Sequence, residues 1–196
     1  MDAKPPLVND GQCNSDSTHP RKAAGQRKPD PKRTAMVLCC VFASITILWL
    51  CFIFSNSLKS ADVSSRDSGR LLAFLQKLLP ALSDHVLRKM AHFAEFAVLG
   101  VLAALTAVFF IKLRRLRASG TAPVKIFPVL CVLFAFGILC PVIDELLQSL
   151  SPGRSTEFLD MLIDFGGFTF GALFPIAAYI FKLSASSRKS SRPIIK

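Results

Sequence analysis

The chain has 196 residues, 52% of them apolar, and its mean hydropathy is +0.45. The apolar residues form long runs, which excludes an ordinary water-soluble domain and favours a membrane protein. The 24 Lys and Arg residues exceed the 13 Asp and Glu residues, giving a net charge of +11. These cations stand between the apolar runs instead of forming one patch. They therefore indicate membrane orientation and contact with anionic lipid headgroups, and they exclude a nucleic-acid partner.

Six cysteines are present, but they form no CxxC or Cys/His metal spacing. Only Cys13 stands in a polar segment. The apolar runs contain Cys39, Cys40, Cys51, Cys131 and Cys140. We expect these five to be small packing residues, not a disulfide framework.

Four apolar runs are long enough to cross a bilayer, whose hydrocarbon core of about 30 Å needs about 20 helical residues. They cover residues 35–54, 90–111, 126–143 and 158–181. The sequence therefore predicts an all-α polytopic membrane protein. We expect a four-helix membrane domain over 35–181, with a disordered tail at 1–34 and a basic tail at 182–196.

Basic residues orient these four spans. The tails and the 112–125 loop together hold 17 Lys and Arg, whereas the 55–89 and 147–157 loops hold 7. Cytoplasmic segments of membrane proteins carry the excess of Lys and Arg. We therefore expect a protein of the cell membrane with both termini in the cytoplasm.

The 55–89 loop carries a second apolar pattern. Leu71, Leu75, Leu78 and Leu82 recur at helical spacing, and Pro80 is expected to break or kink the helix. This pattern predicts an amphipathic helix at the membrane surface. A helix that packs its apolar stripe on the protein itself fits equally well.

Ionisable residues collect at one side of the predicted membrane domain, because they border the outer ends of the last three spans. The candidate polar site consists of His92, Glu95, Asp144, Glu145, Gln148, Arg154, Asp160 and Asp164. Three helices can direct these residues to a common axis, since the members of each pair within a span are three or four residues apart. Arg154 is the expected cation for two of the acids. Each residue taken alone also fits an ordinary interfacial position.

Glycines favour close packing of the fourth span. Gly166, Gly167 and Gly171 lie near its start, and the last two form a GxxxG motif. Such a motif allows two helices to approach closely, so we expect it to hold the span against its neighbours.

In their order along the chain, these residues resemble the VanZ-like family of bacterial membrane proteins. The resemblance covers roughly residues 36 to 181. Its motifs are Arg88-Lys-Met-Ala-His-Phe-Ala-Glu-Phe96, Asp144-Glu-Leu-Leu-Gln148, Pro152-Gly-Arg154, and the Asp160, Asp164 and glycine set, with a Ser-rich stretch that begins at Ser55-Asn-Ser57. Phe96 stands where the family has Tyr, and Leu147 where a polar residue is frequent. The resemblance implies a four-span protein of the bacterial envelope, in a family whose name-giving member is associated with resistance to the glycopeptide teicoplanin.

Several functions fit these patterns. The site could bind a lipid headgroup, a cationic ligand or a partner membrane protein. It could also be a membrane-embedded enzyme that acts on a lipid-linked envelope precursor, with His92 and the carboxylates as acid and base or as ligands of a divalent metal. No cofactor motif such as HExxH is evident. Solute or proton-coupled transport is a third function, for which four spans are few.

Overall fold

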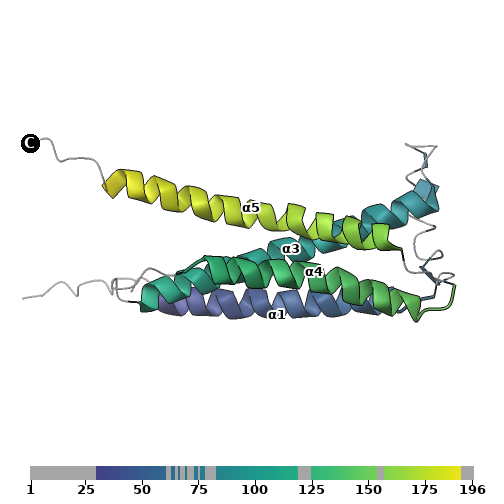
Figure 1. Cartoon of the computed structure of the whole chain (residues 1–196), viewed down its shortest axis with the longest axis horizontal. Coiled ribbons are helices and arrows are strands. Elements are labelled where there is room, and N and C mark those ends of the chain that lie inside the picture. The colour runs from purple at the N-terminus through teal and green to yellow at the C-terminus, as the bar shows by residue number, and fades with distance from the viewer. Residues whose placement is uncertain are drawn as a thin grey trace, which may run out of the picture.

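The computed structural model describes residues 30–60, 83–118, 125–153 and 157–190, the last four of these by backbone alone. Between 61 and 82 it describes positions 63, 64, 66, 69, 73, 74, 76 and 77. Four long helices make up most of the described chain, and it contains no strand. They are α1 (Pro31–Ser57), α3 (Asp84–Arg117), α4 (Phe127–Ser149) and α5 (Phe158–Ser190) (Figure 1). All four are long and apolar enough to cross a membrane, which confirms the predicted all-α fold with four spans.

The helices extend beyond the predicted apolar runs. α1 already begins at Pro31, where the side chain of Asp30 accepts a hydrogen bond from the Lys32 backbone N–H at 3.0 Å. α5 continues past residue 181 to Ser190. The leucines of the predicted amphipathic helix, together with Pro80, lie outside the described residues.

Polar residues at its two ends fix the limits of α3. Ser83 caps the first turn by accepting a hydrogen bond from the Val86 backbone N–H at 3.3 Å, and Asp84 lies in that turn. Three arginines occupy the last turn. An acidic residue at the amino end and basic residues at the carboxyl end both stabilise the helix, because their charges interact favourably with its dipole. At 34 residues and about 1.5 Å per residue, α3 is longer than a bilayer core is thick.

Large apolar side chains cover the outer faces of the four helices. Leu48, Val132 and Phe181 are 69%, 70% and 76% exposed, and each belongs to a different helix. A water-soluble bundle would bury such residues, so this surface is suited to lipid.

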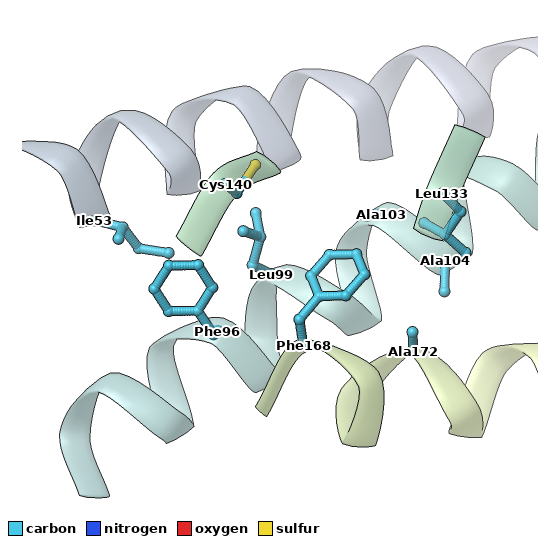
Figure 2. Packing of buried hydrophobic residues seen from close by; sticks show 9 residues of the cluster. All are labelled: Ile53, Phe96, Leu99, Ala103, Ala104, Leu133, Cys140, Phe168 and Ala172. Atoms are coloured by element: carbon cyan, nitrogen blue, oxygen red, sulfur yellow. The ribbon is translucent and has the colours of Figure 1, made fainter. Parts of the chain in front are cut away.

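The apolar core lies where the four helices meet (Figure 2). Phe96 of α3 is fully buried and directed at Ile53 of α1, while Phe168 of α5 lies between α3 and α4, against Gly137. The remaining members of the cluster are Leu99, Ala103, Ala104, Leu133, Cys140 and Ala172. Phe96, which replaces the Tyr of the family pattern, is therefore a packing residue.

Glycines bring α3 and α5 into backbone contact. A Cβ added at Gly167 would clash with the carbonyl oxygen of Phe93, and one added at Gly171 with that of Ala97. On α3, Gly100 meets the carbonyl oxygen of Phe168 in the same way. A side chain at any of these three positions would force the helices apart.

Packing is uneven along the bundle. In α5, Ala172 is the last buried residue among the side chains described up to residue 186. In Figure 1 the yellow half of α5 is angled away from α1 and α4. An apolar groove of about 600 Å³ also opens between α1, α3 and α4, with Thr46, Thr106 and Phe136 among its lining residues. The tightest packing is therefore at the end where α5 begins.

Candidate functional site

The candidate site occupies the end of the bundle where α1 and α4 end and α3 and α5 begin (Figure 1). Seven polar residues are buried in the described chain, and six of them belong to this end. They are Ser57, Asp144, Glu145, Gln148, Ser151 and Asp164. Side chains from α1, α4 and α5, together with Ser151 just after α4, therefore form one buried polar cluster, and α3 packs beside it.

Three of these helices each contribute one member of a His–Asp–Asp triad. His92 of α3 places its Nδ1 3.9 Å from Oδ2 of Asp144 on α4 and 3.9 Å from Oδ1 of Asp164 on α5. One potential ligand atom from each residue lies within 4.8 Å of the other two. Asp144 and Asp164 are at most 1% exposed, and His92 is partly exposed. The triad could hold a metal ion, because imidazole and carboxylate are common metal ligands.

Hydrogen bonds from two neighbours fix the carboxylate of Asp144. The Ser57 hydroxyl of α1 donates to Oδ1, and the Gln148 side-chain amide donates to Oδ2 at 2.7 Å. Ser151 in turn donates to the carbonyl oxygen of Ser57 at 3.1 Å. Since the two donors bind different oxygens of one carboxyl group, they set the orientation of Asp144.

The carboxyl group of Asp164 has fewer hydrogen-bond partners than that of Asp144. Its Oδ1 is buried and accepts no hydrogen bond from any described residue, and no described Lys or Arg forms an ion pair with it. A buried carboxylate without a hydrogen-bonded cation destabilises a fold by several kcal/mol. The site therefore has capacity for one more positive group beside Asp164.

A lysine holds the start of α5 against α3. Lys89 Nζ forms ion pairs with Asp160 and, at 3.1 Å, with Glu157. The Lys89 and Asp160 side chains are 19% and 29% exposed, so water screens this pair only in part. Lys89 and His92 lie three residues apart on the same face of α3, and the ion pairs position that face beside α5.

Glu145 and Glu95 lie at the edge of the cluster and have other partners. The backbone N–H of Glu157 donates to Glu145 Oε1, while Oε2 is buried without a hydrogen bond from the described chain. Glu95 faces α1, where Asn56 approaches its Oε1 at 3.5 Å and the Trp49 indole donates to its backbone oxygen at 2.9 Å.

A cavity of about 160 Å³ leads from the surface to the triad. Basic and acidic residues share its wall. The lining residues are His85, Arg88, Lys89, His92, Gln148, Gly153, Glu157, Asp160, Ile163 and Asp164. A small ligand carrying groups of both charges would match this lining.

The structure places seven of the eight predicted polar residues at this end of the bundle, and it separates them into subsets. Asp144, Gln148, Asp164 and His92 form the centre, Asp160 pairs with Lys89, and Glu145 and Glu95 lie at the edge. Arg154 lies outside the described residues. Of the glycines, Gly167 and Gly171 contact α3, whereas a Cβ at Gly166 would meet only the Phe93 ring, at 3.9 Å.

Four residues of the site are not among those predicted from the sequence. From the sequence, Lys89 counts among the basic residues that orient the membrane spans, and Ser151 and Glu157 belong to the predicted 147–157 loop. Ser57 belongs to the Ser-rich stretch, which contributed only to the family resemblance. Two signals for Lys89 were available: its spacing three residues before His92, and its place in the motif from Arg88 to Phe96.

Comparison with protein families identifies the family of this chain. No curated protein and no solved structure matches the chain. A sequence model of the family described as VanZ/LLP1 matches residues 42–182, which includes every described residue of the triad and of its hydrogen-bonded neighbours. With about seven tenths of its length matched and with four membrane-spanning helices, the chain belongs to the VanZ/LLP1 family.

Proposed function

We propose that this chain is a protein of the bacterial cell envelope that binds the polar headgroup of a lipid-linked envelope molecule. The observation that carries the proposal is the cavity at one end of the membrane helices, which has charged walls and is lined by the partly exposed His92 and the buried Asp164. A lipid-linked molecule can leave its chains in the bilayer while its headgroup enters this cavity.

The orientation of the bundle supports the same proposal. The opposite end carries Lys112, Arg114, Arg115 and Arg117 in the last turns of α3, and Lys125 just before α4. By the positive-inside rule this basic end lies in the cytoplasm, together with both termini. The polar cavity then opens on the extracytoplasmic side, where envelope precursors are used.

The family resemblance connects such binding with glycopeptides. Teicoplanin acts on the envelope from outside the cell, so a protein that binds a lipid-linked precursor on that side can change how the drug reaches its target. We propose this resistance as the phenotype to test.

The test is a deletion strain complemented with single variants. We expect deletion to lower the inhibitory concentration of teicoplanin and to change the amount of one lipid-linked envelope molecule, measured by mass spectrometry of extracted lipids. The wild-type gene should reverse both changes, and the isosteric Asp164→Asn variant should not. Lys125→Gln, a charge change at the opposite end, is the matched control and should behave as wild type. Full complementation by Asp164→Asn would contradict a role for the cavity.

A membrane-embedded enzyme acting on the same class of molecule is the second candidate. It is favoured by the position of His92 between two buried carboxylates, an arrangement suited to proton transfer at the edge of an open cavity. Purified protein in nanodiscs with extracted envelope lipids separates the two functions. An enzyme converts many lipid molecules per chain and loses this turnover in His92→Ala, whereas a binding protein retains a stoichiometric amount unchanged.

A further inference from the structure

The strongest unassigned feature is the geometry of the His92–Asp144–Asp164 triad. We propose that the triad binds one divalent transition-metal ion, Zn²⁺ or Mn²⁺, through one atom of each residue. This inference deepens the proposed function, because it names the metal ion that a bound headgroup would contact. Only the role of the metal rests on the proposed function; metal binding itself does not.

The spacing of the three donors fits a shared ion. Since each of the three atoms lies within 4.8 Å of the other two, a central point lies within about 2.8 Å of all of them. Bonds from Zn²⁺ to His nitrogen and carboxylate oxygen are about 2.0 to 2.2 Å long. Side-chain shifts of at most about 0.8 Å therefore complete the coordination.

The unsatisfied oxygen of Asp164 independently points to a cation. Asp164 is 1% exposed, and its Oδ1, the atom beside His92, accepts no hydrogen bond from any residue that the structure describes. A metal ion at the centre of the triad would satisfy this atom and offset the charges of both aspartates.

The neighbours of the triad form the outer shell that metal ligands usually have. Ser57 and Gln148 both donate to Asp144 and thereby fix the plane of its carboxylate. These two donors come from α1 and α4, so all four long helices hold the arrangement in place.

The type and openness of the site limit the choice of metal. Mg²⁺ and Ca²⁺ prefer oxygen ligands alone, while a mixed set of one imidazole and two carboxylates favours Zn²⁺ or Mn²⁺. His92, Gln148 and Asp164 also line the cavity of about 160 Å³. The ion would keep one or more positions open to water or to a ligand, unlike the closed coordination of a structural zinc site.

The test uses the full chain, purified in detergent and freed of metal by a chelator. Zn²⁺, Mn²⁺, Ca²⁺ and Mg²⁺ are titrated separately, and binding is followed by calorimetry and by the thermal unfolding temperature. We expect one Zn²⁺ or Mn²⁺ per chain, with a rise in unfolding temperature, and at least tenfold weaker binding of Ca²⁺ and Mg²⁺. Absence of stoichiometric Zn²⁺ and Mn²⁺ binding would overturn the proposal.

Isosteric variants locate the ion. Asp164→Asn, Asp144→Asn and His92→Ala should each weaken metal binding more than tenfold. Two control variants should leave the metal affinity unchanged: His85→Ala in the cavity wall and Glu145→Gln in the buried cluster. Without metal, Asp164→Asn should unfold at a temperature at least as high as the wild type, because it removes a buried carboxyl oxygen that accepts no hydrogen bond from the described chain. This control separates lost ligation from lost folding. Unchanged affinity in the triad variants would overturn the assignment. Bound Co²⁺ should also give visible absorption bands that disappear in His92→Ala.

These results are independent of the proposed function. Metal binding with an unaltered deletion phenotype would contradict the envelope function and leave the metal site standing. If Asp164→Asn fails to complement the deletion but the wild-type chain binds no stoichiometric metal, the metal site is contradicted and the envelope function stands.

Discussion

Replacing Gly171 by alanine tests the contact that brings α3 and α5 together. The new Cβ would overlap the carbonyl oxygen of Ala97, which belongs to the α3 backbone and cannot turn aside as a side chain can. Overpacking in a dense interior costs about 1 to 3 kcal/mol. The substitution also brings the helix-propensity gain of alanine over glycine, about 1 kcal/mol. We therefore expect a net loss of up to about 2 kcal/mol.

Gly166 provides the matched control, because it lies on the same turns of α5 and a Cβ there meets only the Phe93 ring at 3.9 Å. Gly166→Ala should be neutral or stabilising by up to about 1 kcal/mol. Reversible unfolding in mixed detergent micelles measures both variants. Equal free-energy changes in the two variants would refute the backbone contact between α3 and α5. So would a stabilisation by Gly171→Ala.

Three further predictions concern the polar end of the bundle. Lys89→Met should lower the free energy of unfolding by about 1 kcal/mol, and adding Asp160→Asn should restore part of this loss. If the two losses simply add in the double variant, Lys89 and Asp160 are not coupled. Ser57→Ala should lower the free energy of unfolding by about 1 to 3 kcal/mol, since it removes a donor from a buried carboxylate, and unchanged unfolding would exclude that hydrogen bond. In a chain whose six native cysteines are replaced, a membrane-impermeant thiol reagent applied to intact cells should label Ser149→Cys and miss Lys125→Cys; the opposite result would place the cavity in the cytoplasm.

Hydropathy alone was sufficient to predict the fold. A span needs only length and low charge, and each of the four apolar runs contains the middle of one observed helix. The helix ends were harder to predict, because polar caps such as Asp30 and Ser83 extend the helices past the membrane-spanning part. Such caps stabilise helix in water as well as in lipid, so hydropathy does not detect them.

The location of the polar site followed from the same pattern, whereas its contacts did not. Acids that border three spans on one side must come close together in any compact bundle. Which acid meets which donor depends on helix rotation: adjacent residues such as Asp144 and Glu145 point about 100° apart and so have different partners. Ser57 could not be identified as a partner of Asp144 from spacing, since 87 residues separate them.

The uneven packing of α5 has a consequence for bilayers of different thickness. Its first half is fixed to α3 by the glycine contacts, while beyond Ala172 no described side chain is buried and Leu173 and Phe174 are exposed. A helix adapts to hydrophobic mismatch by tilting or kinking, and its packing against neighbouring helices sets the tilt. In thin or thick membranes the carboxyl-terminal half of α5 can therefore change its tilt, while Asp164 keeps its position beside His92.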